Sequence, residues 1–236
     1  MSRILSICHT SDMHNSMRAF SFLEKTPNFD FIVDSGDAIK GSSTMFYGSE
    51  PMLKKMSDLN YCAMAMGNRE FNYIAGVIKA RQLQAGFPII SANVEDKTDK
   101  KLISKYTLAE RSGIKIAFIG LTPIQYDETS WWAKIFSFLF YPNVPSVRNV
   151  LEIEEVKSAD VRVLLSHAGL EEDKKMALNL EGIDLILGGH NHIALERPII
   201  VNGIPICHTG AYGEFVGLIR IDLDRLGEIE FNLTAC

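Results

Sequence analysis

Five short polar motifs follow hydrophobic runs in this chain, and their side chains are of the kinds that bind metal ions. The motifs are Asp12-Met13-His14, Gly36-Asp37, Gly67-Asn68-Arg69-Glu70, Ser166-His167 and Gly189-His190-Asn191-His192. Each hydrophobic run is typical of a β-strand, so we expect the motifs at the carboxyl ends of strands, where open α/β sheets bind their ligands. Four of the six histidines fall in these motifs, which favours one shared site over five unrelated turns.

The residue types indicate which ions this site would hold. Carboxylate, amide and imidazole ligands together suit Mn, Fe or Zn, whereas Mg and Ca prefer oxygen alone. Two ions about 4 Å apart need a shared ligand, and a carboxylate serves this well. Asp37 is the expected bridge, because it follows the second hydrophobic run. Asp12 and His14 are two residues apart, as are His190 and His192, so each pair can reach a single ion. We therefore expect two divalent metal ions.

Predicted strands and helices alternate along most of the chain. The strands are expected at 4–8, 29–33, 61–66, 87–91, 114–121, 161–165 and 183–187. The helices are expected at 16–25, 51–59, 73–85, 147–157 and 171–179. Alternation of this kind predicts an α/β core that presents strand ends at one edge.

The C-terminal part has a different pattern. Residues 199–201 and 204–206 flank Asn202-Gly203, which is typical of a tight β-hairpin. Two further strands are expected at 215–223 and 228–233. The predicted fold is therefore mixed α/β (α+β), with a β-rich end.

Length and composition limit the class of protein. A chain of 236 residues fits one domain, 1–236. The net charge of -5 argues against a general nucleic-acid coat protein. It permits a small phosphorylated substrate, because bound metals would supply positive charge. None of the four cysteines forms a C-x-x-C pair. The chain shows no signal peptide and no membrane span, so we expect a cytoplasmic protein.

The segment 131–141 is rich in aromatic residues and fits none of the predicted elements. It holds both tryptophans and lies between Pro123 and Pro142. One interpretation is a helix or loop packed on the core. The others are a mobile flap near the site, a contact through which the chain forms a homo-oligomer, and a patch that touches a membrane.

Three stretches carry a resemblance to a known family. They are Gly67-Asn68-Arg69-Glu70-Phe71-Asn72-Tyr73, Ser91-Ala92-Asn93-Val94, and Gly210-Ala211-Tyr212-Gly213 with Val216-Gly217. With the order of the five motifs, they resemble the calcineurin-like metallophosphoesterase superfamily, most closely the catalytic domain of 5′-nucleotidases. The similarity covers nearly the whole chain. It implies a four-layer αββα sandwich of two mixed β-sheets flanked by helices.

The resemblance also implies a metal-ligand set of seven residues. One ion would be held by Asp12, His14, Asp37 and His192. The other would be held by Asp37, Asn68, His167 and His190. In many 5′-nucleotidases the position of His192 is Gln, so this residue follows the wider superfamily. The implied ions are Mn, Zn or Fe.

The implied reaction is hydrolysis of a phosphoric ester, in which a metal-bridging hydroxide attacks phosphorus. The family sequence Gly-Asn-His-Glu-Phe-Asp-Tyr supplies a catalytic histidine and an aspartate three residues later, and this chain has Arg69 and Asn72 at those positions. Arginine can grip phosphate oxygens with two hydrogen bonds, but its pKa above about 12 prevents it from donating a proton. We predict catalytic roles for Arg69, Asn68 and Asp37, and substrate contacts for Arg69, Asn93 and Asn72.

These departures leave three functions open. The first is a slow or leaving-group-selective phosphomonoesterase or phosphodiesterase, whose small phosphorylated substrate could be a nucleotide. The second is a module of the same fold that binds a metal and a phosphate ligand with weak or no catalysis. The third is a scaffold that uses its aromatic segment for assembly. We expect no additional C-terminal domain of the kind that holds the nucleoside in many 5′-nucleotidases, so the resemblance does not imply nucleotide specificity.

Two histidines lie outside the ligand set. His9 precedes the first motif, and it is expected either to orient a ligand or to be a hydrogen-bonded histidine at a strand end. His208 is expected to be structural.

Overall fold

The computed structural model describes residues 3–26, 28–45, 47–225 and 228–236. One sheet contains six strands, with the bounds β1 (Ile4–Thr10), β2 (Phe31–Asp34), β3 (Tyr61–Ala65), β4 (Ile89–Ile90), β13 (Phe215–Asp222) and β14 (Ile229–Ala235). Its spatial order is β14-β13-β1-β2-β3-β4. The strands from β1 to β4 are parallel, and β13 and β14 pair in antiparallel fashion at one edge.

The second sheet also contains six strands. They are β6 (Tyr106–Arg111), β7 (Ile114–Leu121), β9 (Val161–Ser166), β10 (Leu185–Gly188), β11 (Ile199–Val201) and β12 (Ile204–His208). Their order is β11-β12-β10-β9-β7-β6, with four parallel strands between two antiparallel edge strands. A separate ribbon pairs β5 (Val94–Asp96) with β8 (Phe138–Phe140).

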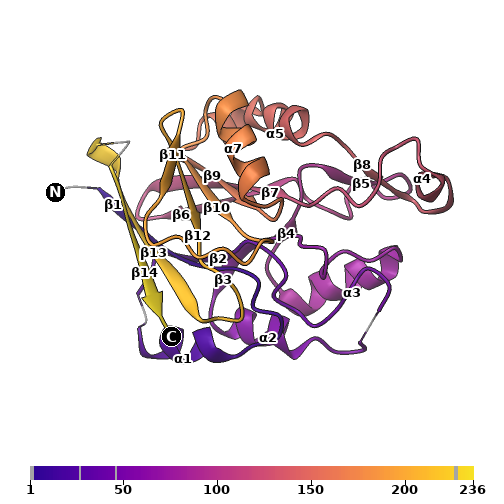
Figure 1. The fold of residues 1–236 in the computed structure, drawn as a ribbon, viewed down its shortest axis with the longest axis horizontal. Coiled ribbons are helices and arrows are strands. Elements are labelled where there is room, and N and C mark those ends of the chain that lie inside the picture. The colour runs from indigo at the N-terminus through magenta and orange to yellow at the C-terminus, as the bar shows by residue number, and fades with distance from the viewer. Residues whose placement is uncertain (1–2, 27, 46, 226–227) are drawn as a thin grey trace.

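Helices cover the outer face of each sheet, as Figure 1 shows. Those on the first sheet are α1 (Arg18–Lys25), α2 (Pro51–Asp58) and α3 (Ala75–Ala85). Those on the second are α5 (Asn143–Leu151), α6 (Glu154–Lys157) and α7 (Leu170–Asn179). The architecture is the four-layer αββα sandwich that the sequence predicted.

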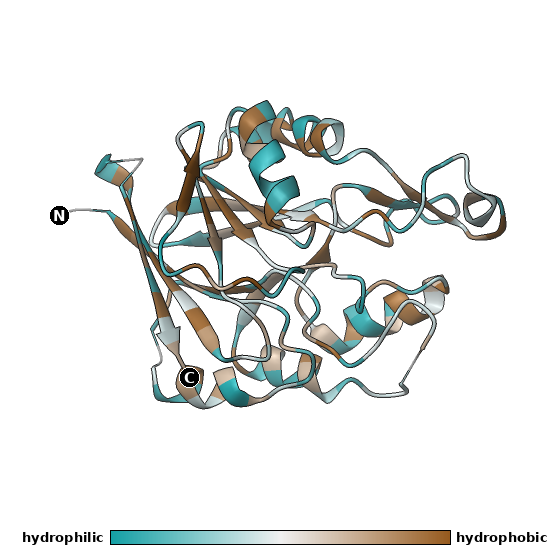
Figure 2. Cartoon of the chain, in the orientation of Figure 1, coloured by the Kyte–Doolittle hydropathy of each residue, from teal (hydrophilic) through white to brown (hydrophobic). Residues whose placement is uncertain are grey.

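The layers are held together by three buried apolar clusters. The cluster between the sheets includes Ile7 and Val33 from the first sheet and Phe118 and Val163 from the second. Strands buried on both faces need a continuous run of apolar residues, and Figure 2 shows these strands as mainly hydrophobic, with hydrophilic residues on the helices around them. The other two clusters lie between each sheet and its helices.

The C-terminal hairpin is confirmed. Asn202 and Gly203 both have left-handed backbone, with φ of 51° and 79°, and they connect β11 to β12. Two positive φ angles in the turn match the right-handed twist of the flanking strands. The sequence therefore placed this turn correctly.

The prediction of one helix at 147–157 was wrong. The structure has two helices, α5 and α6, separated by Glu152 and Ile153. Ile153 is extended, and its carbonyl accepts the N–H groups of Val156 and Lys157, so a second helix begins there. Helix α5 begins earlier than expected, because Pro145 lies in its first turn, where N–H groups have no partner within the helix.

The aromatic segment 131–141 is divided between two environments. Phe138 and Phe140 on β8 are 0% and 4% exposed and pack against Phe71. Trp131 and Trp132, on helix α4 (Trp131–Ile135), are 67% and 50% exposed. Figure 1 shows α4 at the end of an arm that projects beyond both sheets. Packing on the core is found for β8, which is a strand rather than the expected helix or loop, and for Ala133 of α4, which is 5% exposed. The two tryptophans of α4 are exposed.

Within the part of the chain that the structure describes, no helix has the length and apolar character needed to cross a membrane.

Candidate metal centre

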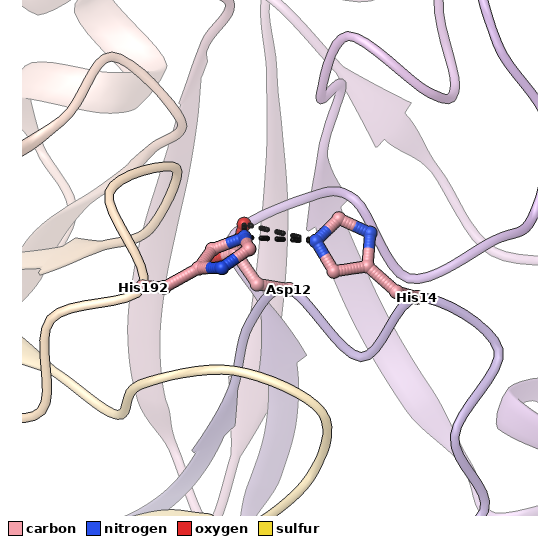
Figure 3. A group of neighbouring side chains, drawn as sticks. All are labelled: Asp12, His14 and His192. Atoms are coloured by element: carbon pink, nitrogen blue, oxygen red, sulfur yellow. Dashed lines mark hydrogen bonds and ion pairs between the residues drawn. The ribbon is translucent and has the colours of Figure 1, made fainter.

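The loops that follow β1 and β10 bring three side chains together. The Nε2 atoms of His14 and His192 lie 2.9 Å apart. They lie 3.9 and 3.5 Å, respectively, from Oδ1 of Asp12. Figure 3 shows both imidazoles directed toward this carboxylate. Ligand atoms that each lie about 2.0–2.2 Å from one ion are separated from one another by distances like these. These three atoms can therefore hold a cation.

A second group of three shares Asp12 with the first. His167 Nε2 lies 3.4 Å from Oδ1 of Asp37 and 3.8 Å from Oδ1 of Asp12. Asp12, Asp37 and His167 are all buried. Two neighbouring carboxylates create a site that favours positive charge. The sequence predicted Asp37 as the bridge, and side-chain geometry places Asp12 in both groups.

Several buried ligand atoms here have no hydrogen-bond partner among the described residues. They are Asp12 Oδ1, Asn68 Oδ1 and His167 Nε2, one from each of three motifs. Buried polar atoms are nearly always paired in native proteins, and an unpaired one calls for an explanation. A bound cation would satisfy all three, so these residues fit divalent ions.

Asn68 follows β3 and is tied to the same place through its neighbour. The backbone N–H of Arg69 donates to Asp37 Oδ1 at 2.8 Å. Asn68 is therefore next in the chain to a residue whose backbone is fixed to Asp37.

His190 lies at the edge of the second group. Its backbone N–H donates to Asp12 Oδ2 at 2.9 Å, and its ring centroid lies 5.1 Å from that of His167. Burial and then the nearby charge of His167 lower the pKa of His190, which favours the neutral imidazole that metals bind. Among the described residues, His190 belongs to neither group of three.

Left-handed backbone is concentrated at these residues. The φ angles are 50° at Asp12, 46° at His14, 56° at Asp37, 79° at His190 and 57° at His192. Each such residue costs of order 1–3 kcal/mol, and strain of this kind clusters at functional sites. The surrounding loop structure must hold these residues in their strained conformations.

Backbone hydrogen bonds join the first motif to the second. The N–H of Asp12 donates to Gly36 O, and the N–H of His14 donates to Asp37 O, both at 2.9 Å. Gly36 has φ of 98°, and a Cβ there would lie 2.8 Å from His167 Nδ1. Glycine is therefore required for this close approach of three loops.

His167 is oriented by the loop after β2. Its Nδ1 lies 2.7 Å from the carbonyl oxygen of Ser35, so Nδ1–H donates and Nε2 is left free. This is the usual arrangement of a metal-binding histidine. Burial lowers the pKa of His167, but the nearby carboxylates outweigh burial. Asp37 contributes most, and the pKa of His167 is raised to about 9.

His9 contacts the same Ser35. Its Nε2 lies 2.8 Å from Ser35 Oγ, which in turn donates to Leu187 O at 2.7 Å. His9 is fully buried, and burial together with the charge of His208 lowers its pKa to about 3. Of the two roles expected from the sequence, the hydrogen bond is confirmed. Its partner is Ser35, the residue whose carbonyl oxygen orients His167.

His208 belongs to a buried triad that joins three elements. Its Nε2 lies 2.8 Å from Asp173 Oδ2, and Asp173 Oδ1 accepts a hydrogen bond from Ser166 Oγ. The three residues come from β12, α7 and the end of β9. A Cβ on Gly188 would lie 2.1 Å from the ring of His208. The expectation that His208 is structural agrees with these contacts, and Asp173 carried no recognisable signal in the sequence.

Glu70 holds the second and third motifs together. Its carboxylate accepts N–H groups of Asp37, Gly67 and Ile39 at 2.8, 3.0 and 3.2 Å. Burial and then the charge of Asp37 raise the pKa of Glu70 to about 7. The sequence placed Glu70 in the third motif but predicted no role for it. Its position beside Arg69 was the feature that could have indicated one.

Arg69 lies at the rim of the site. Its side chain is 39% exposed, and its Nε is 3.8 Å from Asp37 Oδ2. Asp37 is buried, which opposes its ionisation, but the close contact and charge of His167 outweigh burial and hold the pKa of Asp37 below its usual value. The site therefore contains an ionised carboxylate with a guanidinium beside it.

The side chains of Asn72 and Asn93 are bonded within the protein. Asn72 donates to Ser42 O and accepts from the N–H of Ile74. Asn93 is 0% exposed, accepts the N–H of Thr122 and donates to the carbonyl of that residue. Both amides thus fix the course of the backbone, and their contact with a substrate stays a prediction.

Comparison with known proteins places this geometry in context. Residues 5–194 match the family model described as calcineurin-like phosphoesterase. The chain is 27% identical over 273 residues to the Trifunctional nucleotide phosphoesterase protein YfkN of Bacillus subtilis, covering 96% of this chain and 18% of that protein. It is 31% identical over 213 residues to the 5′-nucleotidase of Vibrio vulnificus, covering 77% of this chain and 38% of that protein.

Among solved structures, the fold is similar to that of the 5′-nucleotidase precursor from Thermus thermophilus. The TM-score is 0.81 with 23% identity, over 98% of this chain and 54% of that one. This chain spans less than half the length of the two curated relatives named above.

Proposed function

Because this chain belongs to the calcineurin-like phosphoesterase family, we propose that it is a dinuclear, metal-dependent hydrolase of phosphoric esters. The observation that carries the proposal is that Asp12 Oδ1 and His167 Nε2 lie 3.8 Å apart and, like Asn68 Oδ1, are buried and without partners among the described residues. These atoms come from three loops that strained backbone and buried hydrogen bonds hold in place. An arrangement so costly to maintain favours a functional cation site.

We assign the ions to the seven residues of the sequence prediction. Asp12, His14, Asp37 and His192 would hold one ion, and Asp37, Asn68, His167 and His190 the other. The two groups of three support the separation of His14 and His192 from Asp37 and His167, and they share Asp12 where the assignment shares Asp37. Nitrogen and oxygen ligands without thiolate favour Mn, Zn or Fe. When bound, such ions stabilise charge on phosphoryl oxygens and activate water near neutral pH.

Arg69 is proposed to bind the phosphoryl group in place of the histidine that the family has in this motif. Its partly exposed guanidinium lies beside Asp37 at the rim, where it can donate two hydrogen bonds to phosphate oxygens. A guanidinium stabilises negative charge and gives no proton to a leaving group. Esters whose leaving groups need no proton are therefore the favoured substrates.

A nucleotide is the proposed substrate class, because the two relatives named above are a nucleotide phosphoesterase and a 5′-nucleotidase. The negatively charged phosphate would be drawn to Arg69 and to the bound ions. The organic part of the ester would lie at the open rim, where His192 and Arg69 are each 39% exposed.

The test is a phosphate-release screen with Mn²⁺ over nucleotides, phosphodiesters and sugar phosphates. We expect Mn²⁺-dependent release on at least one class, and its loss in Asp37→Asn. The matched control is Asp58→Asn, since Asp58 is an exposed carboxylate on α2. Release that persists without metal, or that survives in Asp37→Asn, would contradict the proposal.

A second function is favoured by one specific observation, the presence of Arg69 where a proton donor is expected. In this alternative the site binds metal and phosphate with little or no catalysis. Mn²⁺-dependent binding of inorganic phosphate without turnover of any ester in the screen would support it. Turnover that Asp37→Asn abolishes would exclude it.

A further inference from the structure

Tyr212 stands beside two of the histidines of the candidate metal centre. Its ring centroid lies 5.3 Å from that of His14 and 5.5 Å from that of His192. The His14 and His192 rings are themselves 4.9 Å apart, so the three rings form one cluster. Tyr212 is 50% exposed, so one part of its ring contacts the histidines while the rest faces solvent.

The backbone of Tyr212 is strained and is joined to the first motif. Its φ is 57°, a conformation that is uncommon for a bulky residue. Gly210 and Gly213 nearby also have positive φ. Glycine thus occupies the other left-handed positions of this turn, and Tyr212 is the exception. The N–H of Tyr212 donates to Asp12 O at 2.8 Å. An aromatic side chain kept at a position suited to glycine indicates that the ring itself has a role.

The two groups of three differ in how their histidines are oriented. His167 donates its Nδ1–H to the carbonyl oxygen of Ser35. The Nδ1 of His14 is buried and has no partner among the described residues. Metal-binding histidines are normally fixed by a hydrogen bond from the second ring nitrogen. For His14 the contacts that can fix the ring plane are those with His192 and Tyr212.

We propose that Tyr212 is a positioning residue of the metal centre, whose ring holds the imidazoles of His14 and His192 in the orientation that binds one of the two ions. The inference rests on the proposed ion-binding function. It assigns the effect to the aromatic ring, because the contacts with both histidines are made by ring faces and edges. The hydroxyl group is not required.

The experiment is calorimetric titration of the metal-free protein with Mn²⁺, which reports affinity without any need for activity. The variants are Tyr212→Gly and Tyr212→Phe, with Tyr106→Ala as control, a tyrosine on the edge strand β6. Glycine suits the left-handed backbone, so we expect Tyr212→Gly to fold with a melting temperature near that of the wild type. We expect it to bind one ion about 10–100-fold more weakly, the range seen when a ligand-orienting residue is lost. Tyr212→Phe should bind both ions as the wild type does.

The His192→Ala background identifies the ion concerned. That variant should retain the ion of the Asp37 and His167 group, and adding Tyr212→Gly should leave the affinity for that ion unchanged. Wild-type affinities in folded Tyr212→Gly would overturn the inference, as would failure of Tyr212→Phe to restore binding. If the wild type binds no Mn²⁺, the proposed function fails as well. If it binds two ions and Tyr212→Gly does the same with equal affinity, only the role of Tyr212 fails.

Discussion

Glu70 accepts the backbone N–H of Asp37 at 2.8 Å, so one buried carboxylate positions another. The same side chain accepts the N–H groups of Gly67 and Ile39. Two loops, those that follow β2 and β3, therefore depend on one residue that would not itself touch a metal ion or a substrate. This relationship explains how a site built from separate loops can be held rigid.

Glu70→Ala should destabilise the fold. Each buried N–H left without a partner costs about 1–3 kcal/mol, so we expect a loss of at least about 2 kcal/mol in the free energy of unfolding. Chemical denaturation measures it. Glu171→Ala is the control, because this glutamate has a side chain that is 80% exposed on α7, and surface substitutions usually stay within about 0.5 kcal/mol. Equal stability of the two variants would contradict the bracing role of Glu70.

Replacing Arg69 should change which esters the protein hydrolyses. The wild type should act well on aryl phosphates and poorly on alkyl phosphates, because Arg69 cannot protonate the leaving group. Arg69→His with Asn72→Asp should raise kcat on alkyl phosphates by about 10²-fold, the lower end for general acid catalysis. Rates over a series of leaving groups provide the measurement.

A single Asn72→Asp variant controls for structure in that experiment. Asn72 donates to Ser42 O at 3.1 Å, and an aspartate cannot replace this donor, so a stability loss of about 1 kcal/mol is expected. Equal wild-type rates across the series, with chemistry rate-limiting, would refute the role given to Arg69.

Removing metal should lower stability. An ion that binds only the folded state stabilises it by about 2.7 kcal/mol when its concentration is 100 times its Kd. We therefore expect Mn²⁺ to raise the Tm of chelator-treated protein, with a smaller rise in Asp37→Asn and an unchanged rise in Asp58→Asn. An identical Tm with and without Mn²⁺ would be the contrary result. Thermal denaturation measures these changes in Tm and needs no substrate.

The two halves of the aromatic segment should respond differently to substitution. Phe138 is 0% exposed and packs against Phe71, so Phe138→Ala should cost about 3–5 kcal/mol. Trp131 is 67% exposed, so Trp131→Ala should change stability by less than about 0.5 kcal/mol. Denaturation of both variants makes the comparison, and a similar loss in each would show that the Trp131 side chain is packed rather than exposed.

The same segment allows a test of nucleotide stacking. If Trp131 and Trp132 stack on a base, replacing both with alanine should raise KM for nucleotides and leave KM for simple phosphates unchanged. Point substitutions are preferable to deletion of residues 133–140, which would remove Phe138 and Phe140 from the core. An unchanged KM for every active nucleotide would count against stacking.

His9 should make the fold sensitive to acid. Burial and then the charge of His208 lower its pKa to about 3, so folded His9 is neutral while the unfolded residue gains a proton below about pH 6.5. Stability from this group is present above about pH 6.5 and is lost as pH falls toward 3. Between about pH 7 and 5 the loss is about 2 kcal/mol.

His9→Gln is the matched variant, because glutamine keeps a polar side chain and does not titrate. Urea denaturation at about pH 7, 6 and 5 should show that the wild type loses about 2 kcal/mol more than His9→Gln over this range. Parallel curves for the two proteins would show that His9 is not the group responsible.

Much of the fold could be predicted because parallel strands that are buried on both faces appear in the sequence as continuous apolar runs. The strand predicted at 114–121 has these bounds in the structure, since both faces of β7 are covered and a continuous apolar run is required. The short strands β5 and β8 were missed, because three residues paired across a long separation have no periodicity to recognise. The break between α5 and α6 was missed for a similar reason, as the hydrophobic spacing continues across Ile153.

The sequence by itself determined the kinds of candidate ligand atoms, their position after strands, and the presence of an arginine, Arg69, beside Asn68. These are local properties, fixed by residue type and by the hydrophobic runs that precede each motif. Only the tertiary structure decided that Asp12 belongs to both groups of three, that Asn72 and Asn93 bond to the backbone, and that Glu70, Asp173 and Tyr212 support the site. Those roles depend on contacts between loops far apart in the chain, and loop conformation is set by packing and strain rather than by local pattern.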